Sequence, residues 1–412
     1  PWHLLFASIF LLILTLNILL KFQKFYDFKK DKIIQIKSEV LNIYPKNNYD
    51  VIKLKTSNFV YFTSTTKNHK FEKLDIIMAT IYTQKISFYD YMKGFYTNNI
   101  FLENITYEKS FKQNMYGAIK LQHNNYLIKE LFSALFLAVP ISSDLRDITN
   151  TYGISHLLAL SGFHLGLISF VSFWLVYFIY KPFHQKFVPY RNKKFDTLLI
   201  SGLLILAYLI FTDIVPSLLR AFVMYCMGIY LLRNDIKIFS FLNLFIVVLL
   251  ILAFFPKYLL SISLWFSIAG VFYILLYVKY YSKLNIYISF ILFNFWIFFA
   301  LNPIILYFFD VISLAQLFSA PLTLLFILFY PFEILVHFVG QGDILDEYIM
   351  YLFNLEFEIK NYMTSLEFML FFVGVSFLAI YKKIAFYLLN ILIVVFNFYV
   401  YLIIWLIRVF TT

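Results

Sequence analysis

The chain has 412 residues, of which 62% are hydrophobic and 14% are charged, against roughly 25% charged residues in an ordinary soluble domain. A water-soluble protein of this size could not bury so much apolar surface, and disordered or coiled-coil chains need more charge. The net charge of +11 does not by itself indicate nucleic acid, because membrane proteins collect Lys and Arg at cytoplasmic ends. The composition predicts a polytopic α-helical membrane protein.

The chain opens with an apolar segment, residues 2–20, that is long enough to cross a ~30 Å hydrocarbon core as a helix. It runs into Lys21 and Lys24 rather than into the small residues of a cleavage site. We therefore expect a retained first transmembrane helix over residues 1–22.

Residues 29–125 are polar and rich in lysine, and their apolar residues alternate or come in short runs. The pattern predicts strands within residues 32–36, 51–55, 59–62 and 76–82, separated by turn-forming residues. The number and spacing of the strands suggest a small extracytoplasmic β-barrel or sandwich, and the length suits an OB-like module.

The rest of the chain is mostly apolar. Residues 127–141 are too short to span comfortably, so residues 127–155 are interpreted as interfacial or re-entrant helices. Residues 156–412 are predicted to be a multi-helix transmembrane domain, with spans at 156–180, 197–212, 214–232, 238–255, 259–281, 286–309, 313–340, 366–380 and 384–407.

The distribution of basic residues predicts the orientation. The loop 181–194 is strongly basic and belongs in the cytoplasm by the positive-inside rule, which leaves Asp213, Pro256 and Asp310 outside together with the 29–125 domain. This count fails at residues 313–340, because the basic pair at 382–383 then falls on the wrong side. Two prolines lie in that segment, at 321 and 331, so we expect a broken or re-entrant helix there.

The segment 153–166, with the sequence GISHLLALSGFHLG, carries the most unusual residues. In one helix His156 and His164 would lie ~12 Å apart along the axis, too far to share a metal, whereas Ser161 and His164 could hydrogen-bond. Ionisable side chains within a membrane are functional candidates. The alternative is that they cap or join helices, with Gly162 and Gly166 as a small-xxx-small packing pair.

Two further segments complete the candidate site. Arg220 lies about one turn inside a span, where it is either a fixed cation for an anionic substrate or a side chain that reaches back to the interface. Trp265 and Ser267 lie in a segment of small and hydroxyl residues that also suits close helix packing.

Motifs of several enzyme classes are missing from the sequence. There is no G-x-x-x-x-G-K-[ST] phosphate loop, no H-E-x-x-H and no H-x-H-x-D-H cluster. We therefore predict no catalytic residue, no metal site, no cofactor and no enzyme activity for the chain.

These segments, in this order, resemble the ComEC family of competence proteins, the inner-membrane channels for incoming DNA. The resemblance covers roughly residues 127–335 and rests on His156-Leu-Leu-Ala-Leu-Ser161-Gly162-Phe-His164, Pro216…Arg220-Ala221, Ser263-Leu-Trp265-Phe-Ser267, Asn302-Pro303 and Ala320-Pro321. It implies passage of single-stranded DNA across the bacterial inner membrane during natural transformation. On this resemblance, the DNA path includes His156, Ser161, Gly162, His164, Arg220, Trp265 and Ser267.

Many family members carry a C-terminal metallo-β-lactamase-like domain, and this chain resembles the form that lacks it. The resemblance then implies a separate nuclease, an external DNA-binding receptor, and a cytoplasmic ATPase or single-strand-binding proteins as partners, with membrane lipid around the helices. The OB-like domain would lie on the periplasmic or outer side. In that domain we predict a weak DNA contact face, because basic and aromatic side chains suit a single strand: Lys53, Lys55, Phe59, Tyr61 and Phe62.

Two other functions remain open from the residues alone. A rhomboid-like intramembrane serine protease would use Ser161 with a base from another helix, such as His337. A transporter of a small anionic or lipid-linked substrate would use Arg220 and a broken helix at 313–340.

Overall fold

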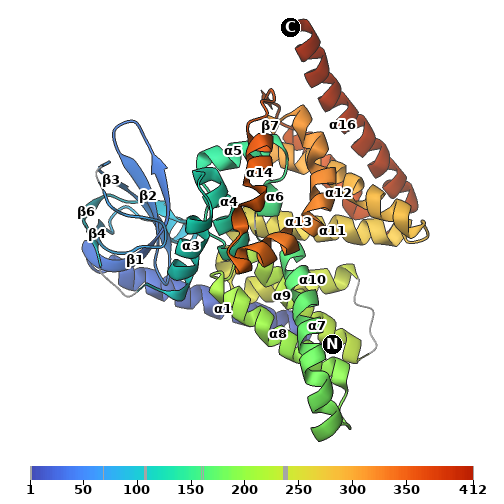
Figure 1. Cartoon of the computed structure of the whole chain (residues 1–412), viewed down its shortest axis with the longest axis horizontal. Helices are drawn as coiled ribbons and strands as arrows, with labels where there is room; N and C mark the ends of the chain where they lie inside the picture. Colours follow the sequence, from blue (N-terminus) through green and yellow to red (C-terminus); the bar gives the residue numbers. More distant parts are fainter. Residues whose placement is uncertain are drawn as a thin grey trace. The chain divides into compact units, whose positions relative to one another are not determined.

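The computed structural model describes residues 2–67, 69–105, 109–158, 160, 162–234 and 240–411, and it is mostly helical (Figure 1). The chain divides into two compact units. The first comprises Pro1–Ser143, Leu160–Ile238 and Leu242–Ser267, and the second comprises Asp144–Ala159, Phe239–Phe241 and Ile268–Thr412.

The first unit begins with a helix that is longer than predicted. Helix α1 (Trp2–Lys29) continues past the expected end of the span, and its last turns lie against the sheet (Figure 1). Phe25 and Phe28, each 8% exposed, belong to the hydrophobic core of the sheet domain. The membrane helix and the sheet domain are therefore joined by shared packing rather than by a free linker.

The sheet confirms the four predicted strands and adds two more. The strands are β1 (Ile33–Pro45), β2 (Asp50–Lys55), β3 (Val60–Thr65), β4 (Ile76–Tyr82), β5 (Phe95–Tyr96) and β6 (Asn99–Asn104), with the short helix α2 (Phe88–Lys93) before β5. Their order is β5-β3-β2-β1-β4-β6. A barrel requires its two edge strands to pair, but β5 pairs with β3 and β6 with β4. The sheet is open, so the predicted closed barrel is wrong.

Strand alternation explains which side of the sheet is the core. Ile52 and Leu54 on β2 and Tyr61 on β3 are fully buried, and their neighbours along each strand face outward. Strand β1 changes register between Val40 and Asn42, and such an irregularity bends and twists a strand. Its first half pairs with β4 and its second half pairs with β2.

The remaining elements of this unit are helical and follow the sheet in the chain. They are α3 (Phe111–Gln122), α4 (Tyr126–Leu137), α7 (Gly162–Phe187), α8 (Lys193–Phe211), α9 (Pro216–Arg233), α10 (Phe241–Phe254), the 3-10 helix η1 (Pro256–Leu260) and the start of α11 (Ile262–Tyr281). Helix α4 is buried on most of its circumference. Helix α4 is therefore a short helix packed mostly against protein, and the interfacial or re-entrant placement of residues 127–155 stays a prediction.

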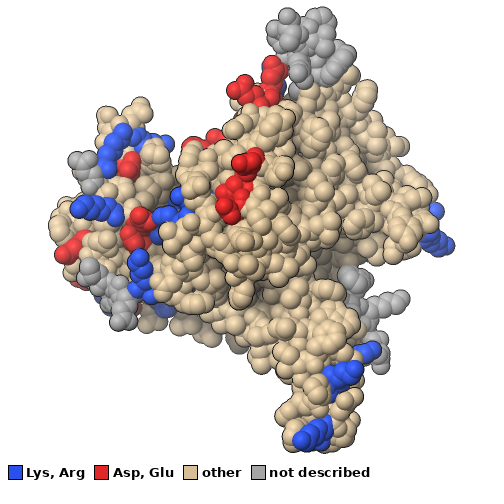
Figure 2. Space-filling view, viewed as in Figure 1, with Lys and Arg blue, Asp and Glu red and all other residues tan. Residues whose placement is uncertain are grey.

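Opposite ends of helix α8 carry the charges that set the predicted orientation. Basic side chains gather at the tip of the α7–α8 pair (Figure 2), whereas Asp213 follows the other end, about 28 Å away at 1.5 Å per residue. Lys55 of the sheet and Lys112 of α3 both bind Asp213. The sheet domain and the α8–α9 turn therefore share a side, as predicted; which side of the membrane this is stays a prediction.

The second unit contains most of the later helices. They are α5 (Ser143–Thr151), α6 (Ser155–Leu158), the rest of α11, α12 (Ile286–Phe308), α13 (Ser319–Val339), α14 (Asp346–Phe353), α15 (Leu366–Leu378) and α16 (Lys383–Thr411), with the 3-10 helices η2 (Leu314–Phe318) and η3 (Gly342–Leu345). In the described part of the whole chain, seven helical segments are long and apolar enough to cross a membrane: Ser8–Lys29, Gly162–Phe187, Lys193–Phe211, Ile262–Tyr281, Ile286–Phe308, Leu314–Val339 and Lys383–Ile403.

Helix α13 is continuous, so the predicted break within residues 313–340 is wrong. Pro321 lies in the first turn, where a missing N–H costs nothing, and Pro331 is accommodated inside the helix. Strand β7 (Val311–Ile312), before α13, pairs instead with strand β8 (Lys360–Asn361), before α15. The chain thus returns after α13 and α14 to the strand that precedes α13. The sides of the membrane on which residues 343–358 and 382–383 lie stay a prediction.

Candidate functional site

Three segments that are far apart in the sequence meet around Arg220 in the first unit. Arg220 lies one turn inside α9 and is 6% exposed. Its Nε donates a hydrogen bond of 2.6 Å to Oγ of Ser267 on α11. Its Nη1 lies 3.2 Å from Sδ of Met224, one turn further along α9. The guanidinium therefore points into the protein, and it does not reach back along its helix to an interface.

The start of α9 is positioned by its own sequence. Pro216 occupies the first turn, where its fixed φ favours helix and its missing N–H is not needed. The hydroxyl of Ser217 donates to the carbonyl of Leu160, just before α7. Residues three apart share one face of a helix, so Arg220 faces α7 as Ser217 does.

Gly162, the first residue of α7, leaves the space that the guanidinium needs. A Cβ added at Gly162 would lie 2.9 Å from Nη2 of Arg220 and 3.7 Å from Cβ of Ala221. Gly166, one turn later, would meet nothing within 4 Å. The two glycines therefore do not form the predicted helix-packing pair, and Gly162 serves the approach of α7 to Arg220.

The electrostatics of this cluster distinguish it from an ordinary ion pair. Among the described residues, no carboxylate pairs with Arg220; its polar partners are a hydroxyl and a thioether. Arginine stays protonated in proteins, and a buried charge is costly unless it is paired. A carboxylate or phosphate that entered this site would receive charge-assisted hydrogen bonds from the guanidinium.

Two other predicted path residues of this unit make contacts of their own. Trp265 is 45% exposed, and its Nε1 donates to the carbonyl of Leu259 in η1, 2.9 Å away. His164 on α7 is fully buried, with its ring edge-on to that of Phe163. Ser161 lies outside the described residues. Of the predicted membrane residues, the structure brings together Gly162, Arg220 and Ser267.

The predicted single helix through His156 and His164 is wrong. His156 lies on α6, which ends at Leu158, whereas His164 lies on α7, which begins at Gly162. Helix α6 belongs to the second unit and α7 to the first, so the spacing calculated along one helix does not apply.

In the second unit His156 anchors two helices. Its Nδ1 lies 3.1 Å from the carbonyl oxygen of Gly153, and its Nε2 lies 3.3 Å from Oγ1 of Thr323 on α13. Gly153 has a left-handed φ of 66°, and its carbonyl also accepts from Ser319. These contacts support the helix-joining interpretation of His156. His337, the base considered for a protease, lies on α13 with Nδ1 2.7 Å from the carbonyl oxygen of Glu333.

The predicted DNA-contact residues of the sheet divide between its two faces. Lys53 and Phe62 are register partners on the outward face, with the ammonium 5.6 Å from the ring centre. Tyr61 is fully buried and Phe59 is 9% exposed, within the hydrophobic core. Burial leaves Phe59 and Tyr61 no surface on which a base could stack in this structure, so they are assigned to the core rather than to a DNA contact.

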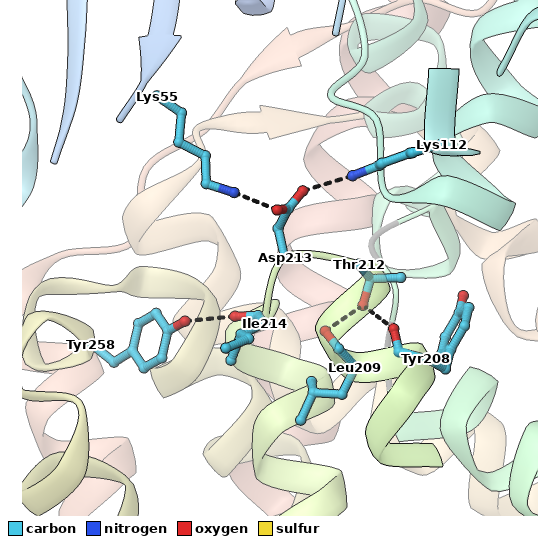
Figure 3. Close-up of polar contacts among 8 residues, drawn as sticks. All are labelled: Lys55, Lys112, Tyr208, Leu209, Thr212, Asp213, Ile214 and Tyr258. Carbon is cyan, nitrogen blue, oxygen red and sulfur yellow. Dashed lines mark hydrogen bonds and ion pairs between the residues drawn. The ribbon is translucent and has the colours of Figure 1, made fainter. Parts of the chain in front are cut away.

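Lys55 shares the outward face and binds an acid that the sequence did not single out. Asp213 Oδ1 accepts from Lys55 Nζ at 2.6 Å and Oδ2 accepts from Lys112 Nζ at 2.7 Å (Figure 3). Burial raises the pKa of Asp213, but the two lysine hydrogen bonds outweigh it, and the net pKa lies below the ordinary value. A single acid between two apolar spans, opposite a lysine-rich domain, is the signal that could have found this cluster.

The described residues contain no group of three or more His, Cys, Asp or Glu side chains placed to hold a metal ion. A protein-family model described as "Competence protein" matches residues 139–407. Searches of curated proteins and of solved structures found no match.

Proposed function

Because the chain belongs to the competence protein family, a membership that supports a role in DNA uptake, we propose that it is a channel for single-stranded DNA. The strand would cross the bacterial inner membrane during natural transformation. We assign no catalytic step to this chain, and a separate nuclease, an external DNA receptor and a cytoplasmic ATPase or single-strand-binding proteins would complete uptake.

Arg220 is the observation that carries this proposal. The polymer to be moved has one phosphate per nucleotide, and Arg220 is a buried cation with no carboxylate partner among the described residues. Such a cation, held by Ser267 and given room by Gly162, suits a phosphate that passes and leaves. A single cation would bind each phosphate weakly. Weak binding suits transport, because each phosphate must be released before the next one can bind.

The sheet domain supports a second contact with the strand. Lys53 and Phe62 on its outward face combine a cation with an aromatic ring, and Tyr44 lies beside Phe62 with ring centres 6.4 Å apart. Nonspecific single-strand binders use this combination of charge and stacking surface. We propose that this face meets DNA outside the membrane.

The continuity of α13 argues against the transporter alternative, because that function required a broken helix at residues 313–340. The protease alternative rests on Ser161, which lies outside the described residues. No observation favours either one over the channel.

The test is the variant Arg220→Ala, measured by the number of transformants and by an immunoblot of the membrane fraction. Charge-assisted hydrogen bonds contribute about 1.5–3 kcal/mol, so we expect transformation to fall about tenfold to hundredfold with protein level unchanged. Arg233→Ala is the matched control, because Arg233 ends the same helix and is exposed.

Labelled double-stranded DNA shows at which step the variant fails. We expect label to be held outside the inner membrane in Arg220→Ala cells and to enter as a single strand in Arg233→Ala cells. Normal entry in Arg220→Ala cells would remove Arg220 from the path. Equal cytoplasmic label in a deletion strain and its complemented parent would overturn the channel itself.

A further inference from the structure

The cluster of Lys55, Lys112 and Asp213 has the form of an occupied phosphate site. One carboxylate lies between two ammonium groups, and each of its oxygens accepts from one lysine, at 2.6 and 2.7 Å (Figure 3). A phosphodiester also has two non-bridging oxygens that share one negative charge, and lysine binds phosphate as a point charge. The two lysines come from β2 and α3, so the pair is assembled by the fold of the first unit.

The cluster is accessible to a competing anion. The side chains of Lys55, Lys112 and Asp213 are 28%, 14% and 38% exposed, and ion pairs at such positions contribute little to stability. A shallow hollow of about 230 Å³ adjoins Lys55 and is lined in part by Lys37 and Thr56. The hollow also contains Glu39, the register partner of Lys55, and burial and the charge of Asp213 raise the pKa of Glu39.

Asp213 is held there on a strained backbone. Asp213 and Ile214 have left-handed φ angles of 63° and 55°, and for a β-branched residue such as Ile214 this conformation is a rare outlier. The hydroxyl of Tyr258 donates a hydrogen bond of 2.6 Å to the carbonyl of Ile214. The hydroxyl of Thr212, at the end of α8, donates to the carbonyls of Tyr208 and Leu209 (Figure 3). Strain of this kind persists only where contacts impose it.

We propose that Lys55 and Lys112 bind a phosphodiester of the incoming DNA strand, and that Asp213 occupies this site until the strand displaces it. The inference rests on the proposed function and extends it to an entry site on the sheet side of the helices. Displacement removes the two contacts that hold the carboxylate of the strained turn. This turn leads directly into α9, which carries Arg220, so occupancy of the site is linked to the start of that helix.

The experiment measures binding of a fluorescein-labelled oligothymidine to the full chain in nanodiscs of zwitterionic lipid, by anisotropy over a series of salt concentrations. The variant is Asp213→Asn, because asparagine tolerates a left-handed φ and removes only the charge. We expect binding about fivefold tighter than wild type. The plot of log affinity against log salt should steepen by about 0.7, the slope that one phosphate contributes on a single strand.

Two further variants show whether the gain in affinity depends on the position of the removed charge and on the two lysines. Asp310→Asn changes the net charge equally at an exposed position in another loop and should leave the binding near wild type. Adding Lys55→Ala and Lys112→Ala to Asp213→Asn should abolish both the gain in affinity and the added slope. Thermal unfolding of each variant checks that it is folded.

Equal effects of Asp213→Asn and Asp310→Asn would overturn the proposal, as would a gain that survives the loss of both lysines or binding by no variant. Nanodiscs with an anionic lipid separate the two sources of phosphate. A gain that vanishes only there would assign the site to a lipid headgroup and overturn its assignment to DNA. The channel proposal fails separately, through normal DNA entry in Arg220→Ala cells.

Discussion

Arg220 and the Lys55–Lys112 pair are two cationic sites in one unit, and they satisfy their charge in opposite ways. Arg220 is 6% exposed and has a hydroxyl and a thioether as partners, whereas the two lysines are partly exposed and share the carboxylate of Asp213. An exposed pair gains little from its partner, while a buried charge without a counter-ion is costly. The free-energy cost of burying Arg220 without a counter-ion indicates that function requires this residue. The lysine pair has a counter-ion, so its burial alone gives no such indication.

Among the variants that test the role of Arg220 while keeping the residue itself, the largest expected loss of transformation comes from a steric change. Gly162→Ala places a Cβ 2.9 Å from Nη2 of Arg220, so the guanidinium must move while its charge remains. We expect transformation to fall about tenfold, the equivalent of one weakened charge-assisted hydrogen bond.

Gly166→Ala is the control for helix propensity and volume, since nothing lies within 4 Å of its added Cβ. Transformant counts at matched protein level should separate the two variants. If both lower the count equally, the space at Gly162 serves the packing of α7 and not Arg220.

A smaller effect is expected at the hydroxyl that fixes the guanidinium. Ser267→Ala removes the acceptor of the 2.6 Å bond from Nε but leaves the cation in place, so water can replace the lost partner. We expect about a threefold loss of transformation. Ser263→Ala, at an exposed position one turn earlier on α11, should behave as wild type. An equal loss in both would show that the effect belongs to helix packing.

The smallest effect concerns pH and the carboxylates near Lys55. The folded pKa of Asp213 is lowered, so its stabilisation is present above its unfolded pKa of about 3.9 and is lost as the pH falls through the folded value. The folded pKa of Glu39 is raised, chiefly by burial, so its stabilisation is present below about 4.3 and is lost as the pH rises through the folded value.

Thermal unfolding in detergent tests this contrast. Near pH 7 we expect Glu39→Gln to raise the melting temperature by about 1–2 °C and Asp213→Asn to lower it by a similar amount. Both differences should shrink at about pH 3. Shifts in the same direction for both variants near pH 7 would contradict the assignment.

The sequence predicted single elements better than their partners. Apolar runs located most of the long helices to within a few residues, although the end of α1 and both ends of α7 were missed by six or seven residues. Alternation located β1 to β4, because both signals are local. The open edges of the sheet depend on pairing between β3 and β5 and between β4 and β6, and no local pattern encodes them. The predicted break in α13 is wrong because Pro321 lies in the first turn, where proline is tolerated, and because an apolar helix packed among others can accommodate a proline such as Pro331.

The same distinction holds at the site. Gly162, Arg220 and Ser267 each stood out as a residue unusual for its span. Their contact could not be predicted, because Arg220 and Ser267 lie on different helices and are 47 residues apart in the chain. Lys112 and Asp213 were missed because their bond spans 101 residues, and that of Lys55 with Asp213 spans 158. A single acid between two apolar spans and a lysine-rich domain are visible in the sequence, but nothing local indicates which lysines bind that acid.

The pairing of β7 with β8 has a consequence for how this chain tolerates change. Tyr362 N–H donates to the carbonyl of Asp310, and Thr364 N–H donates to that of Leu306, at 2.8 and 3.1 Å, so the return is fastened over several residues. The segment between the two strands, residues 313–359, therefore begins and ends at the same place in the second unit. We therefore expect insertions or deletions in the middle of this segment to leave the β7–β8 pairing and the start of α15 in place.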